Sequence, residues 1–356
     1  MGIATVTAGR IRKGQINGQL GEDYLTEMEQ FPHLGMVKTY NIDSQTSDSA
    51  AAATACLCGV KTQIGTIGVD GRAIRNDCPS SIGTNISSIL DWAQTLGSSQ
   101  PLLGLFEPDH MRYEFDRNQS NDDEPSLSRM TKFAIEHFLN FDQGFFLLIE
   151  GGRIDHAHHD TIPRIALDEF VEFDNAVGQA KRTLQANGAL DDSLIIVTAD
   201  HSHVFTIGSY TSRGSNILGF GPLEQPNLSD IDNAPVNIIA YGNGPNFNSS
   251  RNATYLYSLN VNSTDYRAPA AQPMSSETHA AEDVPVYAYG PWSHLFIGTL
   301  EQHTIAHKMA YAACWGIYNT REGCPKASAS QCSISNLILV FLFLISLHND
   351  LFLYDE

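Results

Sequence analysis

The chain of 356 residues carries 40 acidic and 21 basic side chains, which gives a formal net charge of −19. A surface this acidic repels a phosphate backbone, so we expect no nucleic-acid partner. For the same reason, an anionic substrate would need a local positive site, such as a bound metal cluster, to attract it. Hydrophobic residues make up 42% of the chain, enough for one large core or two domains.

The first predicted elements in chain order are a short strand and a helix of small residues. Residues 36–41 read MVKTYN, which is typical of a strand, and a helix is predicted to begin at Ser49. A serine at a helix N-terminus lies beside unpaired backbone N–H groups and the positive end of the helix dipole, where a phosphate can bind. The simpler alternative is that Ser49 or Asp48 is only an N-cap.

The middle of the sequence predicts a strand, a helix and a second strand. An amphipathic helix over residues 127–139 precedes an apolar strand over 145–149. A long amphipathic helix over 165–184 follows, closed by Gly188, and the next strand covers 194–197. This alternation predicts an α/β fold with a largely parallel central sheet flanked by helices.

Residues 145–160, FFLLIEGGRIDHAHHD, contain the first candidate metal ligands. The apolar strand ends at Glu150, a Gly-Gly pair turns the chain, and Asp155 and His159 follow four residues apart. That spacing places both side chains on one face of a helix. A carboxylate oxygen and an imidazole nitrogen suit zinc or a similar divalent ion. An Asp/His pair on a helix surface is the alternative, and this stretch alone does not decide.

Two further histidine motifs adjoin predicted strands. Asp200 and His201, in TADHSH, end one strand, and His279, in SSETHAAEDVPVY, precedes a strand at 284–289. Because the carboxyl ends of parallel strands meet at one edge, we expect Asp200 and His201 to share a crevice with Glu150, on a neighbouring strand. A hydrogen-bonded core or loop residue is the simpler interpretation of any one histidine, but three such motifs favour a metal site.

Several features favour a secreted and membrane-anchored protein. Residues 325–335 are small and polar, and 337–347 read LILVFLFLISL, which is too short to span a bilayer as a helix. This pattern resembles a GPI-attachment signal with its attachment position near Ser328; a disordered apolar tail is the alternative. N-x-[ST] sequons, typical of secreted glycoproteins, begin at Asn85, Asn118, Asn227, Asn248, Asn252 and Asn262. The opening residues MGIATVTAGRIRKGQ have no signal-peptide core, which an incomplete N-terminus would reconcile.

The six cysteines fit this environment in part. Cys314 and Cys324 are close enough in sequence for a local disulfide. Cys56 and Cys58 lie in an apolar segment and are expected to be buried thiols. Cys78 has no evident partner.

Together these stretches resemble the eukaryotic alkaline phosphatases. The matching segments are TVTAGRIRKGQ, DSAAAATACLCGVK, GLFEPDHMRYE, FFLLIEGGRIDHAHH, TADHSHVF, ETHAAEDVPVYAYGP and AHKMAYAAC. The resemblance implies a zinc- and magnesium-dependent phosphomonoesterase with Ser49 as the phosphorylated nucleophile. The ligands that it implies are Asp155, His159 and His279 for one zinc, Asp200 and His201 for the second, and Glu150 for magnesium.

The sequence also departs from the family pattern. The family's G-D-G-M-G strand, whose aspartate bridges the second zinc and the magnesium, has no counterpart here. At Ser98 the sequence passes directly to LLGLFEP, without the family segment that carries the phosphate-binding arginine and another magnesium ligand. We therefore expect incomplete second-zinc and magnesium sites and weak catalysis. The alternative is a catalytically impaired surface glycoprotein, or an incomplete isoform or gene model.

These expectations define a single phosphatase domain in two parts and a tail. Residues 1–97 would carry the nucleophile, 98–324 the metal ligands, and 325–356 the attachment signal. The expected partners are phosphate monoesters and, through a GPI anchor, the outer face of the plasma membrane. The resemblance also allows a homodimer.

Overall fold

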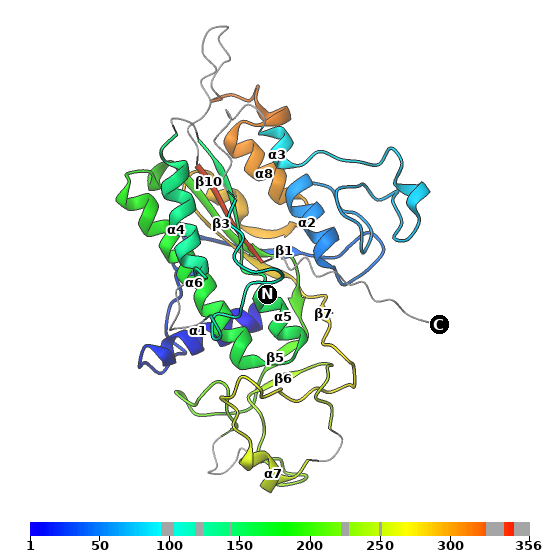
Figure 1. The fold of residues 1–356 in the computed structure, drawn as a ribbon, viewed down its shortest axis with the longest axis vertical. Coiled ribbons are helices and arrows are strands. Elements are labelled where there is room, and N and C mark those ends of the chain that lie inside the picture. Colours follow the sequence, from blue (N-terminus) through cyan, green and yellow to red (C-terminus); the bar gives the residue numbers. More distant parts are fainter. Residues whose placement is uncertain are drawn as a thin grey trace.

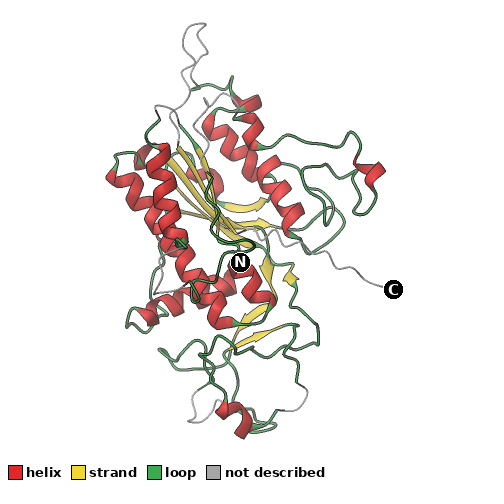
Figure 2. Ribbon diagram, in the orientation of Figure 1, coloured by secondary structure: helices red, strands yellow, loops and turns green. Residues whose placement is uncertain are grey.

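The computed structural model describes residues 1–93, 103–117, 124–141, 144–221, 228–248, 251–324 and 338–344. Within them, a six-stranded sheet lies between two groups of helices, with α4 and α6 on one side and α2, α3 and α8 on the other (Figures 1 and 2). The junction at Ser98, the expected attachment position at Ser328 and the sequons at Asn118 and Asn227 lie outside the described residues.

The order of the strands in the sheet is β2-β10-β3-β8-β1-β9. Their bounds are His33–Lys38 for β1, Phe146–Glu150 for β2, Ser193–Ala199 for β3, Val284–Tyr289 for β8, Gly298–Glu301 for β9 and Ile338–Leu344 for β10. Only β8 runs against its neighbours, since it is antiparallel to β1 and β3 while the other pairings are parallel. The predicted α/β fold with a largely parallel sheet is confirmed.

The helices cover both faces of this sheet. Their bounds are Ile3–Ile16 for α1, Ser49–Cys58 for α2, Ile89–Trp92 for α3, Leu127–Phe138 for α4, Arg153–His159 for α5, Pro163–Ala186 for α6 and Thr304–Ala313 for α8. Helix α6 packs against α1, α4 and α5, and α2 packs against α8. All seven residues of β3 are buried, as expected for a parallel strand covered on both faces.

A smaller subdomain continues from the carboxyl end of β3. In it, β4 (Ser202–His203) pairs with β7 (His279–Ala280), β5 (Phe205–Ile207) pairs with β6 (Ile239–Tyr241), and α7 covers Ala253–Ser258. The pairing of β4 with β7 places His203 directly opposite His279. A short two-stranded ladder thus joins two of the three histidine motifs.

One predicted neighbour relationship is wrong. The strand that ends at Glu150 was expected beside the strand that leads to Asp200, but β10 lies between them and pairs with both. The residues of β10 belong to the apolar run that resembles an attachment signal. Uninterrupted apolar runs are also typical of buried parallel strands, so the sequence pattern alone could not separate these interpretations.

Two further structural expectations can be compared directly. The predicted disulfide joins Cys314 and Cys324. Cys56 and Cys58 are buried free thiols, and Cys78 is an exposed one.

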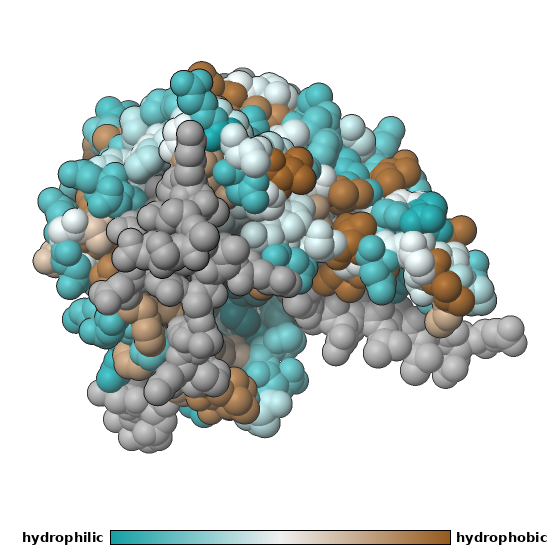
Figure 3. Space-filling view, turned by 90° about the horizontal axis from the view of Figure 1, so that it is seen from above, coloured by the Kyte–Doolittle hydropathy of each residue, from teal (hydrophilic) through white to brown (hydrophobic). Residues whose placement is uncertain are grey.

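None of the helices in the described ranges is long and apolar enough to cross a membrane. On the face shown in Figure 3, hydrophilic and hydrophobic residues are interspersed, as is usual for a protein surface.

Candidate metal centre

Helix α5 presents Asp155 and His159 on one face, as the spacing predicts. The helix starts directly after the glycine turn that ends β2, so both side chains lie at the carboxyl edge of the sheet. Oδ2 of Asp155 is 3.3 Å from Nε2 of His159. The alternative of a surface pair does not hold, because Asp155 is buried and His159 is only partly exposed.

His279 brings a third ligand atom to the same point. Its Nε2 lies 3.1 Å from Nε2 of His159 and 3.4 Å from Oδ1 of Asp155. Ligand atoms bound tetrahedrally to zinc at ~2.0–2.1 Å are separated from each other by about 3.3 Å. The spacings between these three groups therefore match a zinc site.

The outer nitrogens of both rings fix the direction of the inner ones. Nδ1 of His159 donates to the carbonyl of Glu277 at 2.6 Å, and Nδ1 of His279 donates to the carbonyl of Ser47 at 2.9 Å. In a neutral imidazole this leaves a lone pair on each Nε2, directed at the other ring and at Asp155. Two lone pairs and a carboxylate at one point require a shared cation, either a proton or a metal ion.

The ionisation of this group reflects the same requirement. Burial opposes charge on His159, but Asp155 and the carbonyl of Glu277 outweigh it and raise the pKa of His159 to about 9. Burial likewise opposes charge on Asp155, yet the surrounding histidines, His203 first among them, hold the pKa of Asp155 well below its usual range. The centre thus keeps its carboxylate ionised at neutral pH.

Ser49, Asp200 and His201 form the second group of predicted residues. Oγ of Ser49 lies 3.1 Å from Nε2 of His201, and Oδ2 of Asp200 lies 3.0 Å from the same nitrogen. All three are buried. Asp48 occupies the N-cap position of α2 without a side-chain capping bond, since its carboxylate accepts instead from Asn41 and Gly65. Ser49 is therefore the first helical residue, and its hydroxyl faces the histidine cluster.

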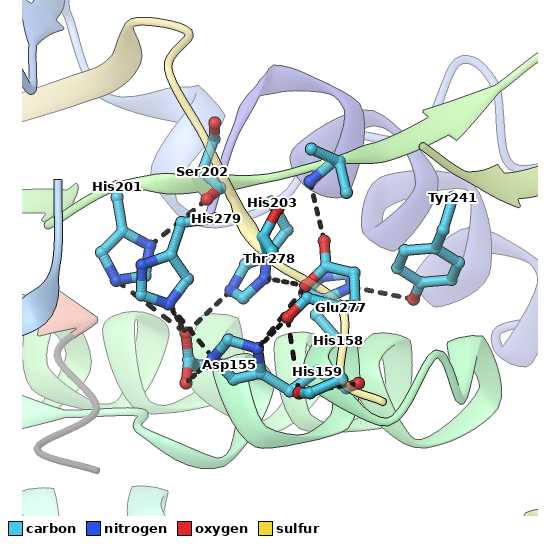
Figure 4. Close-up of polar contacts among 12 residues, drawn as sticks. Asp155, His158, His159, His201, Ser202, His203, Tyr241, Glu277, Thr278 and His279 are labelled. Carbon is cyan, nitrogen blue, oxygen red and sulfur yellow. Dashed lines mark hydrogen bonds and ion pairs between the residues drawn. The ribbon is translucent and has the colours of Figure 1, made fainter. Parts of the chain in front are cut away.

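The sequence analysis missed two buried residues in this centre, His203 and Glu277. Nδ1 of His203 lies 2.7 Å from Oε2 of Glu277, and its Nε2 lies 2.8 Å from Oδ1 of Asp155 (Figure 4). The other carboxylate oxygen of Glu277 accepts from the backbone of Val204. A spacing of two residues puts His201 and His203 on the same side of an extended chain, a signal that D-H-S-H contains.

The two predicted ligand sets lie together as one cluster. The rings of His201 and His279 are stacked with centroids 3.4 Å apart, so the two sets meet there. Ligand atoms lie within 4.8 Å of one another in two groups: Asp155, His201, His203 and His279, and His159, His203 and Glu277. The proximity of the predicted residues is thus clear, while their division between two ions stays a prediction.

Glu150 lies at the end of β2 and belongs to neither group of candidate ligands in the described part of the chain. It lines a cavity of about 310 Å³ together with Arg153 and His156. Glu150 is exposed at the rim of this cavity, so solvent offsets part of the effect by which packing around its carboxyl group, and then the charges of Asp200 and Asp155, raise its pKa. Glu150 thus lies near the acidic residues of the centre, at the end of a strand on the other side of β10.

The buried oxygens of the centre fit a bound cation. Both carboxylate oxygens of Asp155 and Oδ2 of Asp200 are buried, and they face only imidazole nitrogens that are also candidate ligands: Nε2 of His203 at 2.8 Å, of His159 at 3.3 Å and of His201 at 3.0 Å. Burying a charged oxygen without a hydrogen bond is costly unless a positive charge lies beside it. The donor set of carboxylate oxygens and imidazole nitrogens suits zinc. The residues present are therefore suitable ligands for a divalent metal ion.

Comparison of the sequence with known families supports the resemblance. A family described as alkaline phosphatase matches residues 1–100 and 95–315. The two matched pieces meet at the junction expected near Ser98.

Curated relatives align over most of the chain. The tissue-nonspecific alkaline phosphatase isozyme of Gallus gallus is 34% identical over 469 residues, 97% of this chain and 88% of the relative. The isozyme of Homo sapiens is 34% identical over 463 residues, which cover 95% of this chain and 86% of the relative. The alkaline phosphatase of Gadus morhua is 34% identical over 443 residues, which cover 89% of this chain and 90% of the relative. These alignments exceed the 356 residues of this chain, so the relatives contain segments without a counterpart in it.

Solved structures show the same fold. The alkaline phosphatase of the Antarctic bacterium TAB5 superposes with a TM-score of 0.56 at 19% identity, covering 89% of this chain and 95% of that one. The alkaline phosphatase of Thermus thermophilus superposes with a TM-score of 0.55 at 18% identity, covering 88% of this chain and 89% of that one. At these identities the likeness concerns the fold alone.

Proposed function

Because the chain belongs to the alkaline phosphatase family, we propose that it hydrolyses phosphate monoesters through a phosphoserine at Ser49, with zinc and magnesium as its metal ions. One observation carries the proposal: Oγ of Ser49 lies 3.1 Å from Nε2 of His201, which belongs to a cluster of side chains that could hold a metal ion. Capping does not explain this serine, because Asp48 and not Ser49 occupies the N-cap position of α2.

The helix that carries Ser49 would help to hold the substrate. The backbone N–H groups in the first turn of α2 have no acceptor within the helix, so they can receive phosphate oxygens. Oγ of Ser49 would attack phosphorus, and the bond from phosphorus to the alcohol would break. Water would then attack the same phosphorus, the bond to Oγ would break, and inorganic phosphate would leave.

The side chains around Ser49 would hold the metal ions. One zinc would be held by Asp155, His159 and His279, a second by Asp200 and His201, and magnesium by Glu150. When bound, these ions would stabilise negative charge on the attacking, leaving and phosphate oxygens. Each ring is oriented by a contact at its outer nitrogen, such as that of His279 with Ser47, and this orientation keeps the inner nitrogens directed at the site.

Hydrolysis of a chromogenic phosphate monoester at alkaline pH, with added zinc and magnesium, tests this proposal. We expect measurable turnover, and a loss of at least about a hundredfold in Ser49→Ala because the nucleophile is gone. Acid quenching during turnover should trap a phosphorylated peptide that contains Ser49. Ser44→Ala, the same change at a partly exposed serine before α2, should keep its activity. Equal turnover in Ser49→Ala and the unchanged chain would refute the proposal.

We also expect a higher KM than in relatives that contain the internal arginine segment, because the family resemblance implies that this segment supplies a phosphate ligand. Glycosylation, membrane anchoring and assembly into a homodimer stay predictions from the sequence. The sequons that can be examined, at Asn85, Asn248, Asn252 and Asn262, are exposed, as glycosylation would require.

A further inference from the structure

His158 is a buried residue of α5 that belongs to neither group of candidate ligands in the described part of the chain. Its ring is stacked on the ring of His203, with centroids 4.8 Å apart and an angle of 30° between the planes. His203 in turn contacts Asp155 and Glu277 through its two nitrogens. His158 therefore touches the ring that holds Asp155 without being a candidate ligand itself.

The two polar contacts of His203 do not fix its ring completely. Both are made by ring nitrogens, whose N–H bonds and lone pairs lie in the plane of the ring. They oppose a displacement within that plane, but the ring can still tilt about the line that joins its two nitrogens. A second ring packed on one face opposes this tilt. The orientation of His203 thus depends on a fixed position of His158.

Two hydroxyl groups hold His158 in place. The hydroxyl of Tyr241 lies 2.9 Å from Nδ1, and Oγ1 of Thr5 lies 3.2 Å from Nε2 (Figure 4 shows the first contact). A phenol is a better donor than an alcohol, so Tyr241 donates to Nδ1, and the N–H at Nε2 donates to Thr5. The ring of Phe205 packs edge-on against the same imidazole, with centroids 4.9 Å apart. All of these residues are buried.

The smaller subdomain supplies the principal support of His158. Phe205 of β5 lies directly opposite Tyr241 of β6 in their two-stranded ladder. The rings of these two residues also pack edge to face, with centroids 5.3 Å apart. Loss of the phenol hydroxyl would leave a buried nitrogen without its donor, which is costly and would free the imidazole to turn. The subdomain therefore reaches the metal centre through a side chain that hydrogen-bonds no candidate ligand in the described ranges.

We propose that Tyr241 is a positioning residue of the metal centre: its hydroxyl holds His158, His158 prevents His203 from tilting, and His203 keeps Asp155 directed at the metal ion. This inference deepens the proposed function and rests on it only in taking zinc as the bound ion. Removal of one hydroxyl should then weaken zinc binding, although that hydroxyl contacts neither the ion nor its ligands.

Tyr241→Phe tests the proposal, because it removes the hydroxyl and keeps the ring. We expect zinc affinity, measured by competition with a chelator, to fall about 3- to 10-fold, less than for a direct partner of a ligand. Tyr266→Phe is the matched control, since it removes another buried tyrosine hydroxyl of the same subdomain, one that accepts from Asn237. It should leave the affinity unchanged. An unchanged affinity in Tyr241→Phe, or an equal loss in both variants, would overturn the proposal.

A double substitution shows whether Tyr241 acts through His158. His158→Phe keeps an aromatic ring beside His203 but offers Tyr241 no nitrogen. If the hydroxyl acts only through that nitrogen, adding Tyr241→Phe to His158→Phe should cause no further loss of zinc affinity. The same loss in both backgrounds would contradict the proposed route.

The metal-free chain gives a readout that requires neither zinc nor phosphatase activity. Nuclear magnetic resonance of ¹⁵N-labelled histidine rings reports which ring nitrogen carries the proton. We expect His158 to carry it on Nε2 in the unchanged chain and in Tyr266→Phe, and Tyr241→Phe to shift the ring signals of both His158 and His203. Unchanged His203 signals in Tyr241→Phe would refute the inference. A chain that shows these shifts and the loss of zinc affinity but hydrolyses no phosphate ester would support the inference and refute the proposed function.

Discussion

Nδ1 of His203 lies 2.7 Å from Oε2 of Glu277, while Nε2 of the same ring lies 2.8 Å from Oδ1 of Asp155. Burial disfavours a charged ring, but the two carboxylates outweigh it and raise the pKa of His203. The ring therefore links two acidic residues from different elements and holds the orientation of Asp155. A residue that hydrogen-bonds a metal ligand without binding the metal itself changes the basicity of that ligand and fixes its orientation.

The first prediction concerns Glu277→Gln. The substitution removes the negative charge behind His203 and loosens Asp155, so we expect zinc affinity to fall about 10- to 100-fold. Competition with a chelator of known affinity measures the change. Glu136→Gln, on the exposed side of α4, is the matched control and should leave the affinity unchanged. Unchanged affinity in Glu277→Gln would mean that Glu277 serves only to anchor the backbone of Val204.

The second prediction concerns pH and the partly buried Glu169 of α6. Burial raises the pKa of Glu169 to about 8, from an ordinary value of 4.5, although its hydrogen bond from the backbone of Glu114 acts in the other direction. The folded state therefore holds this proton more tightly than the unfolded state. The resulting stability is fully present below pH 4.5 and is lost as the pH rises toward about 8.

Glu169→Gln should remove that dependence, because an amide resembles the protonated acid. Its melting temperature should equal that of the unchanged chain below pH 4.5 and exceed it by a growing margin up to about pH 8. Glu136→Gln should show no such trend. A constant difference at all pH values would show that the titration of Glu169 is not coupled to folding.

The parts of the fold that local periodicity determines could be predicted from the sequence. The amphipathic patterns at 127–139 and 165–184 correspond to α4 and α6, and the predicted strand at 284–289 coincides with β8. The pairing of Asp155 with His159 follows from helix geometry alone. These features need no information from distant residues.

The remaining features depend on distant contacts. The sequence analysis assigned no element to residues 3–16, yet α1 forms there, with Gly9 packed against the ring of Phe170 and Lys13 paired with Asp174. Glu277 acquires its role only when β7 pairs with β4. Tertiary packing of this kind overrides weak local preferences.

The third prediction concerns the buried pair that joins α1 to α6. Nζ of Lys13 lies 2.5 Å from Oδ2 of Asp174, and their side chains are 9% and 0% exposed. Removing one partner of a buried pair leaves an uncompensated charge, so Lys13→Met should cost about 3–5 kcal/mol in the free energy of unfolding. Urea denaturation measures it. Lys132→Met, at an exposed lysine, should change it by less than about 0.5 kcal/mol.

The last prediction concerns metal stoichiometry. Asp155, His159 and His279 offer three protein ligands with the mutual spacing of a zinc site, whereas Asp200 and His201 offer only two before Ser49 is counted. Catalytic zinc sites are typically held by three protein ligands. We therefore expect purified and dialysed protein to retain about one zinc per chain, measured by elemental analysis.

Single substitutions should separate the two sets of ligands. His279→Ala should lose the retained zinc, because it removes one of three ligands, while His201→Ala should keep it. His294→Ala changes a histidine outside the candidate ligand groups and serves as the control for a general effect of losing an imidazole. Two tightly held zinc ions per chain would contradict the prediction, and so would loss of all zinc in His201→Ala. The first result would mean that another residue completes the second site, and the second result would mean that the stacked rings of His201 and His279 serve a single shared centre.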